Sequence, residues 1–219
     1  MKILIGCEES QAVTKAFRTL SHEAYSCDIL PCSGGHPEWH IQSDVLAVIK
    51  GGFFNTQNGD LQEVWNWDMG IFFPPCTHLS AAGAPSWKIK QADGRQQEAI
   101  DFVIKIWDCG IPKIVIENPT GILSTKWMKP NQIINPFMFG DPYRKRTCLW
   151  VKGLPILNTT DIVEPTHHLT SNSYRGGKRK DGTRPISKLP VLNPWDNSKQ
   201  RSKTMPGIAR AMADQWSKI

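Results

Sequence analysis

The 219-residue sequence contains no apolar run as long as the roughly 18–20 residues that a membrane-spanning helix needs. Its opening residues, MKILIGCEES, turn acidic at Glu8 before an apolar segment develops, so we expect no signal peptide. No internal repeat occurs, and none of the six cysteines forms a Cys-x-x-Cys pair. These absences argue against a membrane, secreted or fibrous protein. We expect reduced thiols, no bound metal and a cytoplasmic location.

The excess of positive over negative charge lies in one segment. The chain carries a net charge of +6, yet residues 171–203 hold nine lysines and arginines against two aspartates, which leaves −1 for the rest. This segment is rich in Gly, Pro, Ser and Asn, which predicts a long loop. Clustered cations on such a loop suit phosphates, and the predicted nucleic-acid contacts are Arg175, Lys178, Arg179, Lys180, Arg184, Arg201 and Lys203. The alternative is a solvated loop that meets no polyanion.

The apolar pattern predicts alternating strands and helices. Short apolar runs indicate strands at residues 2–6, 24–29, 68–73, 112–116 and 146–152. Helical spacing indicates helices at residues 10–20, 44–50, 91–109 and 206–218, the first capped by Ser10. Residues 31–40 and 51–61 are expected to be loops. Fully apolar strands between helices favour an α/β protein with a doubly wound, mostly parallel sheet covered on both faces.

Reactive residues follow the predicted strands, and such sheets bind ligands at the carboxyl ends of their strands. The first strand leads into Gly6-Cys7-Glu8-Glu9-Ser10, and the second ends near Asp28. A candidate nucleophile, Cys76, follows Pro74-Pro75 after residues 68–73, and a candidate acid, Glu117, follows the next strand. Taken singly, the thiol could be a small buried hydrophobe and the acid a cap or an ion-pair partner.

These motifs, in this order, resemble those of the cytosine-5 DNA methyltransferases. FFPPCTHLS looks like the strand–Pro–Cys loop of that family, and KIVIENPTG looks like its strand–Glu–Asn motif. YRKRTCLW is similar to its Arg-x-Arg motif, with Arg144 and Arg146 in the matching places, and RSKTMPGIARAMADQW resembles its last motif. The resemblance spans nearly the whole chain and is nearest to short phage-type members. It implies a Rossmann-like, S-adenosylmethionine-dependent methyltransferase fold.

The resemblance also implies a reaction, the transfer of a methyl group from S-adenosylmethionine to carbon 5 of a cytosine flipped out of DNA. The Cys76 thiolate would add to carbon 6, and Glu117 would hold ring nitrogen 3 and the exocyclic amine. Arg144 and Arg146 would orient the base, with Asn118 beside the nucleic acid. The residues expected around the cofactor are Gly6, Cys7, Glu8, Ser10, Asp28, Asp44 and Pro74.

The domain organisation expected from this resemblance has three parts. Residues 1–152 would form the catalytic and cofactor-binding core, residues 153–203 a reduced target-recognition segment, and residues 204–219 a helix that returns to the core. We expect a monomer or a weak dimer that binds DNA in the cytoplasm, which would be the host cytoplasm for a phage-encoded protein.

Several alternatives depend on departures from the family pattern. Glu8-Glu9 stand where the family has a second glycine, which would suit an inactive methyltransferase-like protein that only binds DNA. The same thiol addition could serve another modification at carbon 5 of a pyrimidine. Cys76 with His78 could also act as a thiol hydrolase. Cys27, Cys32, His36 and His40 have a zinc-like pattern, for which the simpler interpretation is a loop with surface histidines, and His167-His168 is interpreted as a solvated turn.

Overall fold

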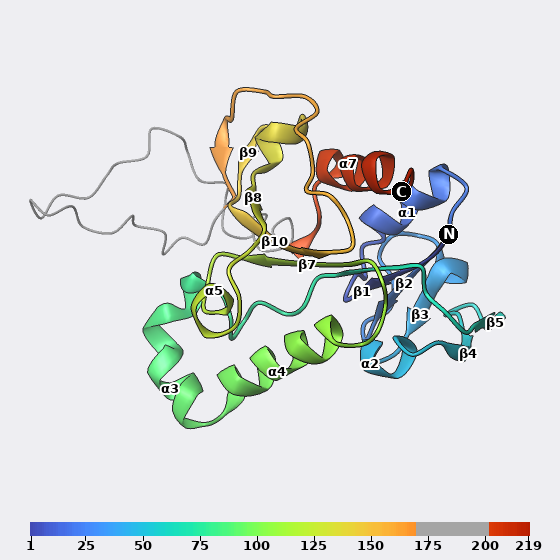
Figure 1. The fold of residues 1–219 in the computed structure, drawn as a ribbon, viewed down its shortest axis with the longest axis horizontal. Helices are drawn as coiled ribbons and strands as arrows, with labels where there is room; N and C mark the ends of the chain where they lie inside the picture. The colour runs from blue at the N-terminus through green and yellow to red at the C-terminus, as the bar shows by residue number, and fades with distance from the viewer. Residues whose placement is uncertain (170–201) are drawn as a thin grey trace, which may run out of the picture.

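The computed structural model describes residues 1–169 and 202–219 (Figure 1). The predicted loop at residues 171–203 therefore falls almost entirely outside the described part of the chain. Of its predicted nucleic-acid contacts, only Lys203 lies within it; the others, Arg175, Lys178, Arg179, Lys180, Arg184 and Arg201, lie outside the described residues.

The described residues form an α/β protein around a mixed, largely parallel sheet of seven strands in the order β3-β2-β1-β6-β7-β10-β8. The strands are β1 (Lys2–Gly6), β2 (Glu23–Asp28), β3 (His40–Gln42), β6 (Met69–Phe72), β7 (Ile114–Pro119), β8 (Gln132–Ile134) and β10 (Thr147–Lys152). The five strands from β3 to β7 are parallel, and β10 runs antiparallel to both β7 and β8. The α/β class predicted from the sequence is confirmed.

Helices cover both faces of this sheet (Figure 1). On one face, α1 (Ala12–Thr19) and α7 (Pro206–Trp216) pack against each other and bury Phe17 and Trp216 over Ile3 and Ile5 of β1. On the other face, α2 (Val45–Val48) and α4 (Arg95–Trp107) share a core with Leu4. Because side chains alternate along a strand, neighbouring residues of β1 belong to different cores.

Two small sheets complete the fold. A hairpin of β4 (Gly52–Asn55) and β5 (Leu61–Val64) occupies the region expected to be a loop at residues 51–61, so that prediction was wrong. Its turn is closed by bonds from the amide and hydroxyl of Thr56 to the Asp60 carbonyl. In addition, β9 (Tyr143–Arg144) pairs in parallel with β11 (His167–His168), which corrects the solvated turn expected at the two histidines.

The helices differ from the sequence prediction at their ends. Ser10 does not cap α1, because Gln11 occupies the N-cap position in a left-handed conformation with φ of 56°. The helix expected at residues 91–109 is two helices, α3 (Trp87–Ala92) and α4, separated at Gly94, whose φ of 84° suits glycine. The strand expected at residues 112–116 runs to Pro119, so it contains Glu117 and Asn118.

The remaining elements are short. They are α5 (Leu123–Lys126) and the 3-10 helices η1 (Pro37–Trp39), η2 (Ala81–Ser86) and η3 (Pro136–Phe139). Within residues 1–169 and 202–219, no helix combines the length and the apolar character needed to cross a bilayer.

Candidate active site

Strand register brings three of the predicted motifs to one edge of the sheet. β6 and β7 are parallel, so the Cys76 loop that follows β6 emerges beside the end of β7. β10 is antiparallel to β7, and its first residue, Thr147, pairs with Pro119 at the last position of β7. The segment before β10, which holds Arg144 and Arg146, therefore lies at the edge where Glu117 lies.

The Cys76 loop is tied to the end of β7 by a side-chain bond. The Asn118 side chain, 1% exposed, donates from Nδ2 to the Pro74 carbonyl at 2.8 Å. Pro74 is buried, whereas Cys76 is exposed two residues further on. The thiol thus sits at the surface of a loop whose base is fixed to the Glu-Asn strand.

Backbone bonds hold the rest of this loop. The Cys76 carbonyl accepts from the amides of Leu79 and Ser80, which closes a turn directly after the thiol. The Leu79 carbonyl accepts from the Ile122 amide at 2.8 Å, and the Lys90 ammonium of α3 donates to the Thr77 carbonyl at 2.7 Å. The loop is therefore held by α3 on one side and by the segment after β7 on the other.

Glu117 pairs with a residue that the sequence prediction missed. Lys145 Nζ lies 3.7 Å from Glu117 Oε1, and the two side chains are 17% and 14% exposed. The predicted arginines on either side, Arg144 and Arg146, are exposed instead, and the Arg144 guanidinium lies 5.6 Å from the ring centroid of Phe137. In an extended segment neighbouring side chains point to opposite sides, so an outward Arg-x-Arg pair directs the residue between them inward.

Buried polar atoms without a hydrogen-bond partner gather around the Cys76 loop. Among the described residues they are His78 Nδ1, Trp87 Nε1 and Asn118 Oδ1. His78 belongs to the loop, Asn118 is bonded to it, and Trp87 begins α3. Unpartnered buried polar groups are uncommon in folded proteins. His78 Nδ1 forms no hydrogen bond with Cys76, so the hydrolase alternative gains no support at that atom.

At the same edge of the sheet, beyond β6, the turn after β1 lies near two carboxylates. The Cys7 amide donates to the Cys27 carbonyl at 2.7 Å, which joins the ends of β1 and β2. Burial raises the pKa of the Cys7 thiol, and the nearby Cys27 thiol and the carboxylates of Asp28 and Asp44 raise it further. Burial likewise raises the pKa of Cys27, to about 12. Both thiols therefore stay protonated near neutral pH.

Glu8 has a structural role that its sequence position did not reveal. Its carboxylate, 4% exposed, accepts from the Val13 amide at 2.6 Å and from the Thr14 hydroxyl at 2.7 Å. A further bond comes from the Thr14 amide at 3.2 Å, so Glu8 provides the cap predicted for Ser10. Burial raises the pKa of Glu8 to about 7, against the opposing effect of these bonds. The predicted cofactor contact is thus a side chain already bonded to the first turn of α1.

Gly6 is required by packing. A Cβ at this position would lie 2.5 Å from a ring carbon of Phe72 and 2.7 Å from a methyl group of Val45. The space that a side chain of residue 6 would occupy is therefore filled by the buried side chains of Phe72 and Val45.

The residues at the ends of β2 and β3 fit the adenosine half of S-adenosylmethionine. Carboxylates can accept hydrogen bonds from ribose hydroxyls and from an adenine amine, and Asp28 and Asp44 lie near one another around Cys7. Directly after Asp28, Ile29 and Leu30 are 73% and 56% exposed. These two apolar side chains offer a surface on which a planar ring can pack.

Three of the four residues of the zinc-like pattern form other interactions through their side chains. Cys27 is buried and its thiol donates to the Ser43 carbonyl. The ring of His40 is fully buried, with Nδ1 bonded to Ser26 at 2.8 Å and Nε2 bonded to the Leu30 carbonyl at 2.9 Å. The expectation of a surface histidine was therefore wrong at His40. His36 stacks on Trp39 with ring centroids 3.9 Å apart. No group of three or more metal-binding side chains is found in the described ranges.

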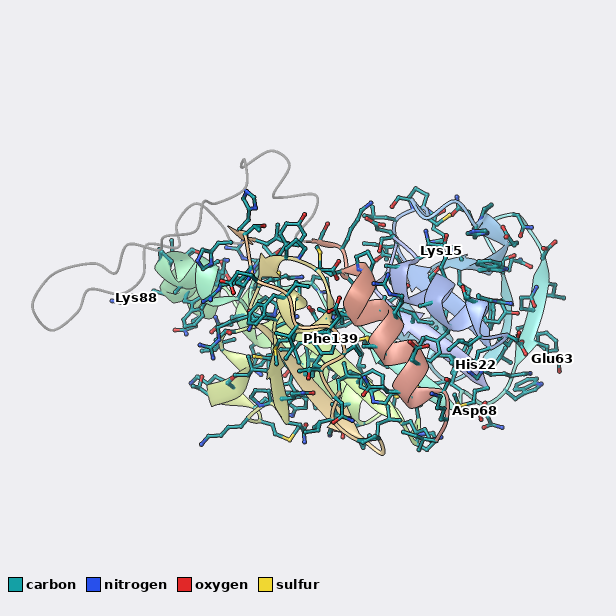
Figure 2. All side chains as sticks on the ribbon, turned by 90° about the horizontal axis from the view of Figure 1, so that it is seen from above. Lys15, His22, Glu63, Asp68, Lys88 and Phe139 are labelled. Carbon is teal, nitrogen blue, oxygen red and sulfur yellow. The ribbon has the colours of Figure 1, made fainter. Side chains whose placement is uncertain are left out.

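A surface cavity of about 530 Å³ lies beside α1, apart from the Cys76 loop. Lys15, Arg18, His22 and Trp39 are among its lining residues, together with His36 of the zinc-like pattern, and none of them was expected in the methyltransferase site. Figure 2 shows Lys15 and His22 far across the molecule from Lys88 of α3, the helix that holds the Cys76 loop.

Comparison with known proteins supplied no relative, because neither a protein-family model nor a curated protein matches the chain. A functional assignment therefore depends on the geometry of the site itself.

Proposed function

We propose that this chain is an S-adenosylmethionine-dependent DNA cytosine-5 methyltransferase with a Rossmann-like fold. The observation that carries the proposal is the bond from Asn118 Nδ2 to the Pro74 carbonyl. It joins the Pro-Pro-Cys loop to the Glu-Asn strand, the two most specific motifs of the sequence resemblance. Chance similarity in two separate sequence segments gives no reason for them to be bonded to each other.

The strand order supports a Rossmann-like interpretation. The chain starts at β1 in the middle of the sheet, proceeds outward to β3, and then returns to β6 on the other side of β1. Sheets wound in two directions bind ligands in the crevice at the carboxyl ends of the strands where the direction reverses. In this protein that reversal lies between β1 and β6, with the carboxylates of Asp28 and Asp44 on one side and Cys76 on the other.

Cys76 is the proposed nucleophile. Its thiolate adds to carbon 6 of the cytosine, which makes carbon 5 an enamine carbon able to attack an electrophilic methyl group. The electron pair displaced through the ring collects at nitrogen 3, where donors fixed in advance stabilise it. Glu117 binds the edge of the base, and Arg144 and Arg146 hold the flipped nucleotide at the mouth of the site.

When S-adenosylmethionine is bound, the chemistry it supplies is an electrophilic methyl group. Asp28 and Asp44 accept hydrogen bonds from its hydroxyl and amine groups, and Ile29 with Leu30 exclude water from its ring. The buried thiols of Cys7 and Cys27, whose pKa values are raised, remain neutral and do not compete as nucleophiles.

The basic sequence at residues 171–203 supports DNA as the substrate. In this proposal residues 153–203 contact the target, while residues 1–152 and 204–219 form the catalytic core. We also propose that the protein works in the cytoplasm as a monomer or weak dimer.

A second candidate, a DNA-binding protein without methyl transfer, is favoured by the packing around Ser10. Ser33 bonds to Glu9 through both its amide and its hydroxyl, and a Cβ at Gly34 would lie 2.6 Å from the Ser10 carbonyl. The segment after β2 thus covers the turn where the methionine half of the cofactor is expected.

The test uses purified protein, unmodified double-stranded DNA and S-adenosylmethionine with a tritiated methyl group. We expect label in 5-methylcytosine after hydrolysis of the DNA, and its loss in Cys76→Ala. Cys109→Ala is the matched control, since this thiol lies between α4 and the start of β7, at the edge of the sheet opposite Cys76. Absence of label, together with no cofactor binding by calorimetry, would overturn the methyltransferase proposal, and retained DNA binding would then favour the second candidate.

A further inference from the structure

We infer that Lys145 is a catalytic residue that donates to ring nitrogen 3 of the target pyrimidine, beside Glu117. This inference rests on the proposed function and names the donor that the reaction requires. The sequence resemblance assigns contact with nitrogen 3 to the acid alone, whereas the structure provides an acid and an ammonium together.

The position of Lys145 supports this role. Its ammonium reaches Glu117 Oε1 at the edge of the sheet where Cys76 emerges, and both members of the pair are more than four-fifths buried. β9 ends at Arg144 and β10 begins at Thr147, so Lys145 lies in a two-residue connection fixed at both ends by strands. Such a short connection restrains the backbone of Lys145, and the Glu117 carboxylate attracts its ammonium.

The two charged groups are not joined by a short hydrogen bond. Nζ and Oε1 are 3.7 Å apart, whereas a charge-assisted hydrogen bond is about 2.7–2.9 Å long. Each partner can therefore form a shorter bond to a group that lies beside the pair. A base edge with an acceptor next to a donor matches an ammonium next to a carboxylate.

Cytosine presents such an edge. Its nitrogen 3 accepts a hydrogen bond and its exocyclic amine donates one. Lys145 would donate to nitrogen 3, and the ionised carboxylate of Glu117 would accept from the amine. Lys145 then acts as an ammonium and Glu117 as a carboxylate, as they do in the ion pair. The carboxylate therefore does not have to be protonated before the base binds.

The addition step balances with these groups. The sulfur electron pair of Cys76 forms the bond to carbon 6, the double bond between carbons 5 and 6 shifts to carbons 4 and 5, and an electron pair moves to nitrogen 3. The proton from Lys145 Nζ transfers to nitrogen 3, which leaves a neutral enamine and a neutral amine. Without any cofactor, carbon 5 can then take a proton from water, which leaves hydroxide, and pass its original proton to that hydroxide. The thiolate then leaves, and nitrogen 3 returns its proton to Nζ.

This exchange of the hydrogen at carbon 5 can be tested without cofactor. The assay measures the release of tritium from DNA labelled at carbon 5 of cytosine. We expect Lys145→Met to release tritium about 100- to 1000-fold more slowly than wild type, the cost of removing one such donor. Lys145→Arg should recover part of the rate, because it restores a cationic donor. Lys105→Met is the matched control: it removes an exposed lysine from the last turn of α4, outside the proposed site, and should leave the rate unchanged.

The outcomes separate this inference from the proposed function. Release by wild type and Lys145→Met at rates within about twofold would overturn the role of Lys145 and leave Cys76 as the nucleophile. No release by wild type would overturn the thiol addition and the role of Lys145 with it. Thermal unfolding and DNA affinity are measured for each variant; if Lys145→Met is unfolded, Lys145→Gln takes its place. Equal rates in folded Lys145→Gln and Lys145→Arg would also refute the need for a cation.

Discussion

The carboxyl group of Glu8 gives the sharpest prediction about stability. Its structural role can be measured in the cofactor-free protein, apart from any role in cofactor binding. In the folded protein the pKa of Glu8 is about 7, against an ordinary value of 4.5, and burial is the main cause. A raised carboxyl pKa means that the folded state holds the proton more tightly than the unfolded state. The resulting stabilisation is fully present below about pH 4.5 and is lost as the pH rises through 7.

The size of the effect follows from the pKa difference. One unit corresponds to about 1.36 kcal/mol, so the contribution of Glu8 to the free energy of unfolding should fall by the order of 3 kcal/mol between pH 4.5 and pH 8. Glu8→Gln keeps the shape of the side chain and does not titrate. The difference in unfolding free energy, wild type minus Glu8→Gln, should therefore decrease as the pH rises.

Urea unfolding of the cofactor-free protein at several pH values between 5 and 8 measures this difference. Glu8→Ala should cost about 2 kcal/mol at pH 5, since it leaves the amides of Val13 and Thr14 without their acceptor. A wild-type advantage that grows with pH would refute the reasoning, because it would mean that the three hydrogen bonds to the carboxylate outweigh its burial. Unchanged stability in Glu8→Ala would refute the cap itself.

Three further predictions concern packing, thiol reactivity and the loop. Gly6→Ala should lower the unfolding free energy by about 1–3 kcal/mol in urea, because its Cβ would overlap the Phe72 ring; a neutral effect would contradict the packing. In native protein at pH 8, iodoacetamide should modify exposed Cys76 well before Cys27, whose pKa burial raises to about 12, and peptide mass spectrometry should show equal labelling only after unfolding. Asn118→Leu should lower the free energy of unfolding by about 1–3 kcal/mol, because it leaves the Pro74 carbonyl without its donor, and it should slow tritium release. Full activity would contradict the anchoring role.

The central strands could be predicted from the sequence because their apolar runs are continuous. Strands buried on both faces leave that pattern. The parallel strands β1, β2 and β6 and the antiparallel strand β10 lie where it indicated. The hairpin of β4 and β5 leaves no such pattern, because half of its residues are exposed. The pairing of β11 with β9 joins segments more than twenty residues apart and depends on tertiary contact.

The sequence was sufficient to predict which strand ends carry the candidate site. The edge on which Cys76 and Glu117 lie follows from two consecutive apolar strands, and the structure adds the Asn118 bond that connects them. Lys145 could not be selected from sequence, because an inward lysine between two arginines is recognised only once the register of β10 against β7 is known. The cap by Glu8 was equally hidden, since it requires the left-handed Gln11 that turns the chain back.

The most direct test of the central claim uses DNA in which 5-fluorocytosine replaces cytosine, incubated with the protein and S-adenosylmethionine. Fluorine at carbon 5 is not lost as a proton would be, so the thiol remains bonded to carbon 6 after methyl transfer. The account predicts a covalent complex with the mass of protein, DNA strand and one methyl group, and a peptide map that places the bond at Cys76. A bond at another cysteine, or 5-methylcytosine formed in ordinary DNA while the fluorinated DNA yields no covalent complex, would contradict it.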